Sequence, residues 1–515
     1  MEEQAMGYEE AVRRIEEARE TGATRLDLSD QELTELPPEL FQLSDLTSLN
    51  LWENRLTSLP PELFQLKNLT ELCLRDNYLV SLPPELFQLK NLSTLNLSLN
   101  KLAELPPELF ELKKLTELDL GSNKLTSLPP EFFQLKNLTE LCLRDNYLVS
   151  LPPELFQLKN LSTLDLCFNQ LSALPPELFQ LTNLRLLNLI VNQLASLPPE
   201  IVQLTKLERL ELYHNPLTSP PYELAVQGIE AIREYFASAE EGTRTVAEVK
   251  VILVGEGASG KTSLTRCLRE ERFNAHEETT HGIRIKNWKL DTDDQPLRCN
   301  LWDFGGQEIM HATHQFFLSR RSLYVLVLDG RRDERPEYWL RYIESFGGGS
   351  PVLVVLNKYD TNPGFDLNRP FLKKKYPFIV DFYRTSCRTG NGIRNFRQAL
   401  REELGKVPLT RNEWPESWFR AKERLEVLND PCISYEACET LCREAGVKGE
   451  ISRQVLVDFL HDLGIVIHFK EFDLSHKNVL DPKWVTGAVY KIINAPSIAE
   501  RNGLFSKDDL REILR

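Results

Sequence analysis

The stretch "AEVKVILVGEGASGKTSLTRCLREE", residues 247–271, decides the fold of the middle of this chain. It begins with an apolar run rich in β-branched residues, continues with the pattern G-x-x-x-x-G-K-T at 255–262, and ends with a helical pattern. In a strand–loop–helix unit of this kind, glycines let backbone N–H groups close on phosphates at the start of the helix. The stretch therefore predicts a phosphate-binding loop within an α/β domain.

Each residue of this loop is a candidate for contact with a nucleotide. Lys261 is expected to reach the outer phosphates, and the hydroxyl of Thr262 is expected to ligate Mg²⁺. The predicted binding residues of the loop are Gly255, Glu256, Gly257, Ala258, Ser259, Gly260, Lys261, Thr262 and Ser263. The loop alone does not separate ATP from GTP.

Two further segments supply the groups needed at the γ-phosphate. The segment "CNLWDFGGQE", 299–308, is a predicted strand that ends in D-x-x-G-Q. Asp303 would hold Mg²⁺ through water, Gly306 would bond the γ-phosphate, and Gln307 would orient the attacking water. Thr280 lies 19 residues after Lys261, where a loop could bring its hydroxyl to the metal. The predicted metal ligands are thus Thr262, Thr280 and Asp303, and the predicted catalytic residues are Lys261, Thr280 and Gln307.

The choice of base is decided by "VLVVLNKYD", 352–360, a buried strand followed by N-K-x-D. Asp360 can accept both the N1 and N2 hydrogens of guanine, whereas adenine would leave this carboxylate unmatched. Asn357 and Lys358 complete the motif, and Ser386 and Cys387 of "RTSC" would place backbone N–H groups at guanine O6. The order of all these segments agrees with Ras-like GTPases, and the predicted ligands are GTP or GDP with Mg²⁺ as cofactor.

Two other motifs compete for the same residues. The tripeptide "DFG" at 303–305 also occurs in kinases, but no H-R-D loop, strand lysine or A-P-E accompanies it. The hexapeptide "HEETTH" at 276–281 resembles a zinc helix, but its histidines are five residues apart and do not share a helix face. Kinase and zinc chemistry are therefore disfavoured.

An internal repeat precedes the nucleotide-binding segment. The tetrapeptide "LPPE" recurs every 23 residues from Leu36 to Leu197, and L-x-x-L-x-L-x-x-N runs between its copies. This is the leucine-rich-repeat pattern, in which stacked coils share one leucine core. We expect a capping helix at 1–22, a repeat solenoid at 23–224 and a linker helix at 225–244.

The repeats predict an asparagine ladder and a binding face. Asparagine side chains are expected to bond backbone groups at each turn, with Gln31 taking that place in the first coil. The ladder residues are Asn54, Asn77, Asn100, Asn123, Asn146, Asn169, Asn192 and Asn215. The strand residues between the leucines are mostly polar but turn apolar toward Leu186, Ile190 and Tyr213, which leaves two interpretations, a solvated face or a docking patch.

Residues 408–515 predict a third, α+β module after a GTPase domain at 245–407. Three helical patterns and a short β segment suggest a winged helix, and Asp458 and Asp462 on its third helix favour protein over DNA contact. The chain stops within the helical pattern "DDLREILR", from which we expect this module to be truncated.

Composition limits the partners and the compartment. The net charge of −15 disfavours nucleic acid or an anionic membrane as the main partner. The nine cysteines lack metal-ligand spacing, and several, Cys73, Cys142 and Cys167, fall at repeat positions expected to face solvent, which suits a reducing cytosol. With no signal peptide and no long apolar run, we expect a cytoplasmic protein without a membrane span.

Taken together, the repeats, the GTPase segment "DFGGQEIMHATHQFF" and "LDPKWVTGAVYKIIN" resemble the Roco family over nearly the whole chain. In that family the GTPase is called Roc and the module after it COR, and the family includes the Parkinson-associated leucine-rich-repeat kinases. This chain is most similar to bacterial members without a kinase. The resemblance implies intrinsic GTP hydrolysis and a nucleotide-driven monomer–dimer cycle, with dimerisation mainly through the C-terminal half of COR.

Three functions remain open at this point: a GTP-hydrolysing switch, a repeat scaffold with a structural and nearly inactive GTP site, and an ATP-driven oligomeriser. Gln307 favours the first, and the N-K-x-D motif opposes the third. We expect slow hydrolysis without a partner arginine. The arginines near the switch segments are Arg320, Arg321, Arg331 and Arg332, each expected to be a solvated surface charge rather than a catalytic finger.

Overall fold

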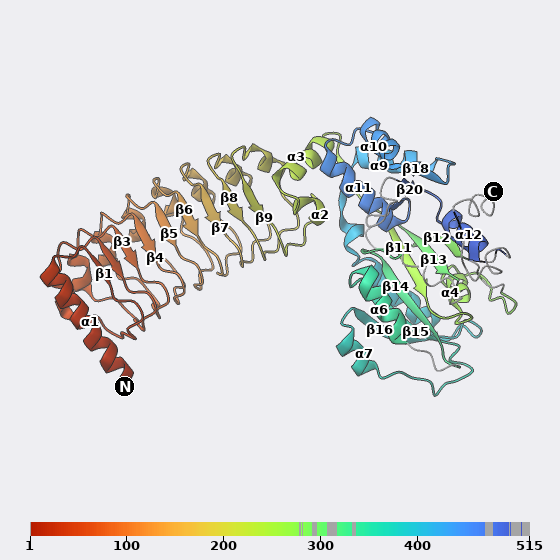
Figure 1. Cartoon of the computed structure of the whole chain (residues 1–515), viewed down its shortest axis with the longest axis horizontal. Helices are drawn as coiled ribbons and strands as arrows, with labels where there is room; N and C mark the ends of the chain where they lie inside the picture. Colours follow the sequence, from red (N-terminus) through yellow and green to blue (C-terminus); the bar gives the residue numbers. More distant parts are fainter. Residues whose placement is uncertain are drawn as a thin grey trace. The chain divides into compact units, whose positions relative to one another are not determined.

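The computed structural model describes residues 2–277, 280, 282–290, 296–305, 317–331, 336–468, 477–493, 495 and 506. The chain forms two compact units, residues 1–236 and 237–515 (Figure 1). None of the helices in the described ranges has the length and the apolar character needed to cross a bilayer.

The first unit is a solenoid whose described residues form one sheet of nine parallel strands in sequence order (Figure 1). Each strand pairs in register with the equivalent residues of the next coil, so that Leu118, for example, lies between Leu95 and Leu141. The strands are β1 Arg25–Asp27, β2 Ser48–Asn50, β3 Glu71–Cys73, β4 Thr94–Asn96, β5 Glu117–Asp119, β6 Glu140–Cys142, β7 Thr163–Asp165, β8 Leu186–Asn188 and β9 Arg209–Glu211.

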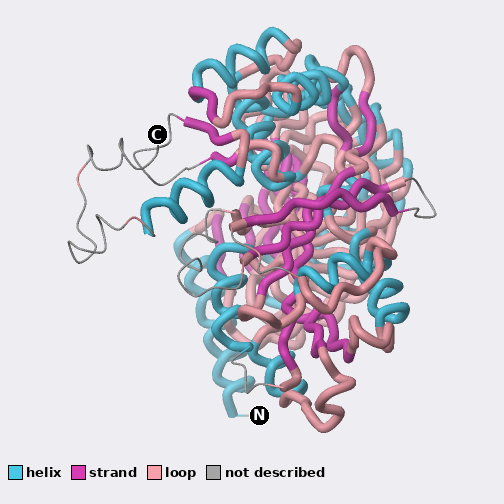
Figure 2. The backbone as a smooth tube through the Cα atoms, turned by 90° about the vertical axis from the view of Figure 1, so that its right-hand side faces the viewer, coloured by secondary structure: helices cyan, strands magenta, loops and turns pink. Residues whose placement is uncertain are grey.

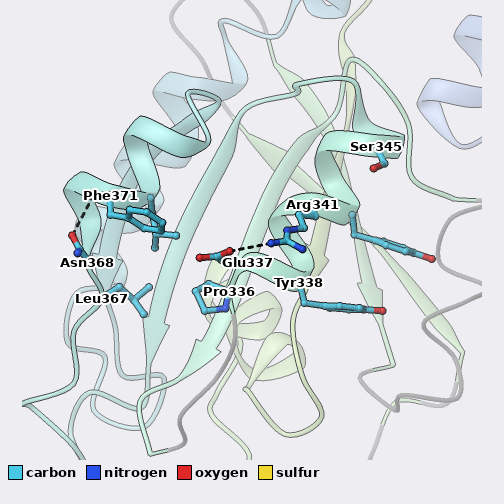
Figure 3. A pocket seen from close by; sticks show the side chains of 10 residues that line it. Pro336, Glu337, Tyr338, Arg341, Ser345, Leu367, Asn368 and Phe371 are labelled. Carbon is cyan, nitrogen blue, oxygen red and sulfur yellow. Dashed lines mark hydrogen bonds and ion pairs between the residues drawn. The ribbon is translucent and has the colours of Figure 1, made fainter.

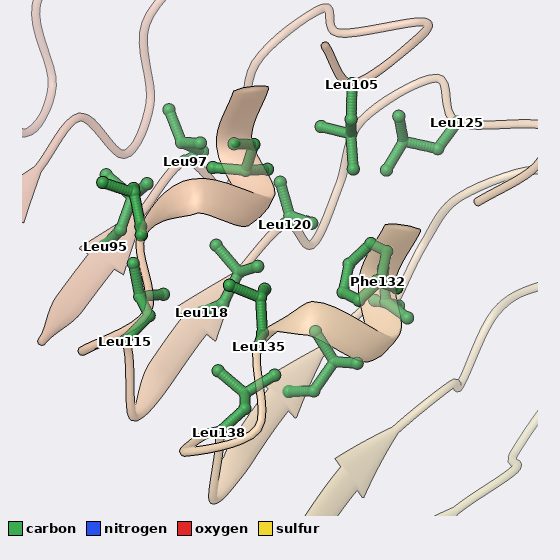
Figure 4. Packing of buried hydrophobic residues seen from close by; sticks show 14 of the residues in the cluster. Leu95, Leu97, Leu105, Leu115, Leu118, Leu120, Leu125, Phe132, Leu135 and Leu138 are labelled. Carbon is green, nitrogen blue, oxygen red and sulfur yellow. The ribbon is translucent and has the colours of Figure 1, made fainter. Parts of the chain in front are cut away.

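The return segment of each coil is a short 3₁₀ helix that begins at the second proline of "LPPE". Proline suits this position because its fixed φ matches a helix start and it has no N–H to satisfy. These helices are η1 Pro38–Gln42, η2 Pro61–Gln65, η3 Pro84–Gln88, η4 Pro107–Glu111, η5 Pro130–Gln134, η6 Pro153–Gln157, η7 Pro176–Gln180 and η8 Pro199–Gln203. Leucines of neighbouring coils pack together in one core, and Figure 4 shows several of them, among them Leu95, Leu118 and Leu138.

The predicted asparagine ladder is confirmed. In the central coil Asn123 donates from Nδ2 to the carbonyls of Leu97 at 3.0 Å and Leu120 at 3.1 Å, and its Oδ1 accepts from the N–H of Leu102 at 3.0 Å. Gln31 takes this place in the first coil, where its Nε2 donates to the carbonyl of Asp30 at 2.8 Å. The ladder therefore satisfies backbone groups that the turns would otherwise leave buried and unpaired.

Helices close the two ends of this unit. Helix α1, Glu2–Thr21, covers the open edge of the first coil with Ala11 and Ile15, which lie in the leucine core. At the other end, α2, Tyr222–Ala225, and α3, Ile229–Ser238, bury Ala225 and Ile232 in the same core. Helix α1 thus lies within the range 1–22 for which we expected a capping helix.

One prediction about the repeats is wrong. Cys73 and Cys142 are half-buried, and Cys167, which we expected to face solvent, is buried. Neighbouring strands lie about 4.8 Å apart, so larger side chains of adjacent coils cover a small thiol at this position. Burial of Cys167 raises the pKa of its thiol to about 12.

The second unit contains a six-stranded sheet in the order β12-β13-β11-β14-β15-β16, whose strands are labelled in Figure 1. Figure 2 draws strands in magenta and helices in cyan. All neighbours are parallel except β12, which runs antiparallel to β13. The strands are β11 Glu248–Val254, β12 Ile283–Leu290, β13 Leu297–Phe304, β14 Leu323–Asp329, β15 Val352–Asn357 and β16 Ile379–Arg384. The associated helices are α4 Lys261–Leu268, α6 Pro336–Gly347, α7 Arg369–Lys375 and α8 Ile393–Leu404.

The predicted helical module with a β wing follows this sheet. Its small sheet has the order β18-β20-β19 within the described residues. Its elements are η9 Pro408–Arg411, α9 Glu416–Glu426, β18 Cys432–Ser434, α10 Tyr435–Glu444, α11 Glu450–Leu463, β19 Ile467–His468, β20 Lys477–Val479 and α12 Pro482–Ile493. A separate antiparallel pair, β10 Thr243–Thr245 with β17 Glu413–Pro415, joins the start of the unit to this module.

The module shares a core with the six-stranded sheet. Ile467 and Val479 of the wing belong to the same buried cluster as Trp302 and Phe304 of β13. Gly464, which ends α11 with φ +76°, lies so close to Trp302 that a Cβ there would be 2.2 Å from its ring. The two parts of the second unit are therefore packed as one body at this contact.

Candidate functional site

The glycine-rich loop joins β11 to α4 in a conformation that side chains would block. Gly255 has φ +138°, and a Cβ there would lie 2.1 Å from the carbonyl oxygen of Val327. Gly260 has φ +99°, and its Cβ would lie 2.2 Å from Nδ2 of Asn357. Both glycines are required by backbone conformation and by space.

Lys261 and the start of α4 make the loop a site for an anion. The Lys261 ammonium donates to the carbonyl oxygens of Gly255 at 2.7 Å and Glu256 at 2.8 Å, which holds it over the loop. Helix α4 begins at Lys261, so its first N–H groups face the loop and favour negative charge there.

The three predicted metal ligands converge. The Thr262 hydroxyl donates to Oδ2 of Asp303 at 2.6 Å, and it lies 3.1 Å from the hydroxyl of Thr280. Thr262 comes from the start of α4, Asp303 from the end of β13, and Thr280 from the segment before β12. Thr280 and Asp303, which follow Thr262 by 18 and 41 positions, thus lie next to it in the fold.

The residues at this point fit a hard divalent cation. Oδ1 of Asp303 is buried and has no hydrogen-bond partner among the described residues. Burial raises the pKa of Asp303, although the Thr262 hydrogen bond and the Lys261 charge oppose this. A carboxylate beside two hydroxyls is the all-oxygen donor set that Mg²⁺ prefers, together with water and phosphate.

Asn357 connects the predicted base-binding segment to the phosphate loop by hydrogen bonds. Its Nδ2 donates to the carbonyl of Ser259 at 3.0 Å. Its Oδ1 accepts from the Thr385 hydroxyl at 3.3 Å and from the Cys387 thiol at 3.5 Å. One amide therefore ties together three segments that are far apart in the sequence.

Lys358 and Asp360 follow at the mouth of the site. Lys358 donates to the carbonyl of Ala258 and, at 2.9 Å, to Oδ2 of Asp329. Asp360 is exposed and lines the cavity next to them. Ser386 is buried, and its N–H donates to the carbonyl of Asn391 at 2.9 Å, which closes the loop between these two residues.

A cavity of about 360 Å³ connects these groups. It opens between the phosphate loop, the Thr280 segment and the N-K-x-D motif, with cationic, hydroxyl and carboxylate groups converging on it. Its lining residues are Gly257, Ala258, Gly260, Lys261, Thr262, Ser263, Phe273, Asn274, Ala275, Glu277, Thr280, Phe304, Arg331, Asn357, Lys358, Asp360, Thr361, Cys387 and Arg388.

A larger cavity of about 760 Å³ lies between α6 and α7 (Figure 3). Tyr338, Leu367 and Phe371 line it, and its charged groups Glu337 and Arg341 are paired with each other at 3.5 Å. It has no glycine-rich backbone and no free cation cluster among the described residues. The smaller cavity is therefore the better candidate for phosphate binding.

Several predicted site residues lie outside the described residues. These are Gly306, Gln307 and Arg332. The second histidine of "HEETTH", His281, is also among them. Their roles stay predictions.

Among the neighbouring arginines, Arg321 differs from the expectation of a solvated surface charge. Arg320 is exposed, as expected. Arg321 is largely buried and pairs with Asp462. Arg331 is partly exposed, but its guanidinium is held by Asp329 through Nε at 3.0 Å and Nη2 at 2.8 Å. Asp462, which is distant in the sequence, fixes the position of Arg321, and Asp329 at the end of β14 fixes that of Arg331.

Sequence reasoning missed Asp329, Phe273 and Arg388, and it did not place Arg331 in the lining of this cavity. Asp329 ends the apolar run "LYVLVLD", and a carboxylate at the carboxyl end of a parallel strand was a usable signal, because ligands bind at that edge. No motif or strand end in the sequence indicates that Phe273, Asn274 and Arg388 line the cavity.

Comparisons with known proteins agree with this architecture. The profile of the family described as "Ras of Complex, Roc, domain of DAPkinase" matches residues 250–360, and that of "C-terminal of Roc, COR-A domain" matches 415–515. Leucine-rich-repeat profiles match four segments between residues 21 and 217.

Two curated relatives come from Dictyostelium discoideum. The probable serine/threonine-protein kinase roco5 is 29% identical over 55% of this chain and 12% of its own length. The probable serine/threonine-protein kinase pats1 is 31% identical over 57% of this chain and 10% of its own length. The chain thus spans about a tenth of the length of these relatives.

A solved structure also matches the second half of the architecture. The structure of Methanosarcina barkeri Roco2 RocCORdC bound to GDP is 52% identical, has a TM-score of 0.52, and covers 54% of this chain and 86% of that one. With leucine-rich repeats, a Roc sheet and a COR-A module in this order, the chain belongs to the Roco family of proteins.

Proposed function

We propose that this chain binds GTP with Mg²⁺, hydrolyses it to GDP and phosphate, and acts as a molecular switch. The observation that carries the proposal is the convergence of Thr262, Thr280 and Asp303 beside the 360 Å³ cavity, which Thr262 and Thr280 line. Lys358 and Asp360 of the N-K-x-D motif line the same cavity. A related Roc–COR structure was determined with GDP, which supports a guanine nucleotide here.

We assign the role of Gln307 from its sequence motif and the other roles from the motifs together with the positions of the groups. The loop N–H groups and Lys261 bind the phosphates, and Thr262, Thr280 and Asp303 supply oxygen atoms for the metal. Bound Mg²⁺ would neutralise charge that develops on the phosphate oxygens. Gln307 orients the attacking water, and the guanine edge donates to Asp360.

Switching would come from ordering of the segments around Thr280 and Gln307 by the γ-phosphate, and from their release on hydrolysis. We infer from the family resemblance that nucleotide state also controls a monomer–dimer cycle and that the repeats bind protein partners, in the cytoplasm. Light scattering with GDP and with a non-hydrolysable GTP analogue tests the cycle. One molar mass in both states would argue against it.

A competition assay tests the nucleotide. Fluorescent GDP bound to the purified chain should be displaced by GTP and GDP but not by ATP at the same concentration. Equal displacement by ATP would overturn the base assignment and revive the ATP-driven alternative.

Single-turnover hydrolysis separates the switch from a structural GTP site. The chain should convert bound GTP to GDP slowly, and Gln307→Leu should bind GTP normally but hydrolyse it more slowly. Absence of turnover in the parent chain, also at high protein concentration, would favour the scaffold with an inactive site.

A further inference from the structure

Asp329 is a fully buried carboxylate at the edge of the nucleotide cavity. It ends β14, next to the end of β15 that leads into the N-K-x-D motif, and its side chain has no exposed surface. Its Oδ1 accepts from the N–H and the Nε of Arg331, each at 3.0 Å. Its Oδ2 accepts from Nη2 of Arg331 at 2.8 Å and from Nζ of Lys358 at 2.9 Å. All its acceptor sites are thus directed to two cationic residues.

These bonds keep Asp329 ionised. Burial by itself would raise the pKa of this carboxyl, but the hydrogen bonds from Arg331 and Lys358 lower it to about 2. A buried charge is tolerated when it is paired and fully hydrogen-bonded, as it is here. The carboxylate therefore acts as a fixed anion beneath two cations.

Both cations line the nucleotide cavity. Lys358 adopts the left-handed conformation, φ +59°, and its ammonium also reaches the carbonyl of Ala258 in the phosphate loop. Such a backbone conformation is unfavourable in a residue with a side chain, so it persists only where surrounding contacts hold it. Asp329 supplies one of those contacts.

Arg331 is held in a fixed orientation by the same anion. Its two-point contact with Asp329 restricts rotation of a side chain that is otherwise 46% exposed. The pKa of Arg331 is raised, chiefly by its hydrogen bond to Asp329, and the charge of Asp360 contributes to the same shift. The guanidinium therefore lies in the field of the carboxylate that is proposed to read guanine.

We propose that Asp329 is a positioning residue of the nucleotide site and that Arg331 contacts the bound nucleoside. A planar guanidinium binds well against an aromatic base or its ribose, and more so when its rotamer is already fixed. The inference rests on the proposed binding of guanine nucleotide in this cavity. It adds two residues that lie outside the phosphate-loop, D-x-x-G-Q and N-K-x-D motifs.

The test measures dissociation of fluorescent GDP and of its inosine analogue from the 515-residue chain. Asp329→Asn keeps the shape but removes the charge, and it should speed release of both nucleotides about tenfold or more. Arg331→Ala should act in the same direction, and the double variant should release GDP more slowly than the product of the single effects predicts.

A control variant, a base-specificity measurement and a melting temperature distinguish a positioning role of Asp329 from a general effect on charge or stability. Asp381→Asn removes an exposed partner of Lys373 on the adjacent strand β16 and should leave GDP release unchanged. Asp360→Ala should erase the preference for GDP over the inosine analogue, whereas Asp329→Asn should retain it. The melting temperature of the nucleotide-free Asp329→Asn variant should stay near that of the parent.

Release within twofold of the parent rate in Asp329→Asn would overturn the proposal. A melting temperature that falls equally with and without nucleotide would assign Asp329 to stability alone, which also overturns it. Failure of the parent chain to bind GDP would instead refute the proposed function, and is recognised before any variant is made.

Discussion

Arg321, in the loop before β14, forms an ion pair with Asp462 at the end of α11, and the two side chains are only 17% and 7% exposed. The Arg321 guanidinium also lies over the ring of Phe459, 4.7 Å from its centroid. Lys250 of β11 is fully buried nearby and donates to the carbonyl of Phe317 at 2.7 Å. These contacts tie the strand that leads into the phosphate loop to the COR module.

Loss of one partner of this pair should destabilise the chain. Arg321→Ala leaves the Asp462 carboxyl buried without its cation, which typically costs about 3–5 kcal/mol in the free energy of unfolding. The double change Arg321→Met with Asp462→Leu should recover most of that loss. Urea unfolding measures both, with Arg341→Ala at an exposed pair as control; equal effects of Arg321→Ala and the control would contradict the prediction.

The buried lysine predicts a pH dependence of stability. Burial lowers the pKa of Lys250 to about 7, from 10.5 in an exposed lysine. Between these values the unfolded chain binds more protons, so the free energy of unfolding should rise with pH above about 7. Lys250→Met should flatten this rise when urea unfolding is compared at pH 7 and pH 9. An unchanged slope in the variant would show that other groups cause it.

Asp462 should act in the opposite direction at lower pH. Burial raises its pKa to about 6, although Arg321 and Lys250 oppose the shift and Asp458 adds to it. The folded chain then binds the extra proton, so this contribution to stability is present in acid and is lost as the pH rises through about 6. Together, the contribution of Asp462 and Lys250 to the free energy of unfolding should be smallest near pH 6–7.

The converging oxygens predict a dependence on magnesium. Thr262→Ala removes one proposed ligand and the donor to Asp303. GDP release from the parent chain should speed up when Mg²⁺ is chelated, and the variant should release GDP fast with or without the metal. Stopped-flow release in the presence and absence of EDTA measures this. A parent chain indifferent to Mg²⁺ would remove the metal from the proposed site.

The base-reading carboxylate predicts a change of specificity. In Asp360→Asn the amide can donate to the C2 oxygen of xanthine, so affinity should shift from guanosine toward xanthosine diphosphate. Titration of each nucleotide against the parent and the variant measures the shift. Retained preference for GDP in the variant would mean that another group reads the base.

The asparagine ladder predicts which asparagines matter for the solenoid. Asn123→Ala leaves the buried N–H of Leu102 without its partner, and a buried unpaired group typically costs about 1–3 kcal/mol. It also removes one of two donors from the carbonyls of Leu97 and Leu120, which keep their bonds from Asn100 and Asn146. Asn137→Ala is a matched control, because Asn137 is exposed and makes one bond, to the carbonyl of Lys113 at 2.8 Å. Similar melting temperatures for the two variants would contradict the role of the ladder.

The sequence alone determined what is local or periodic in this protein. A 23-residue repeat requires every coil to place its leucines and its asparagine in the same way, so the solenoid and its ladder follow from spacing. The phosphate loop follows similarly, because glycine, lysine and threonine act within one strand–loop–helix unit.

Tertiary structure decided the pairing of charges that are distant in the chain. Arg321 and Asp462 are 141 residues apart, and nothing in their local sequence marks them as partners rather than as solvated surface groups. In the sequence, Asp329 is only the last residue of an apolar strand. The pairing of β14 with β15 in the fold brings Lys358 within hydrogen-bond distance of it. Burial gives such pairs their strength, because a charge removed from water needs a specific partner, and burial is a property of the whole fold.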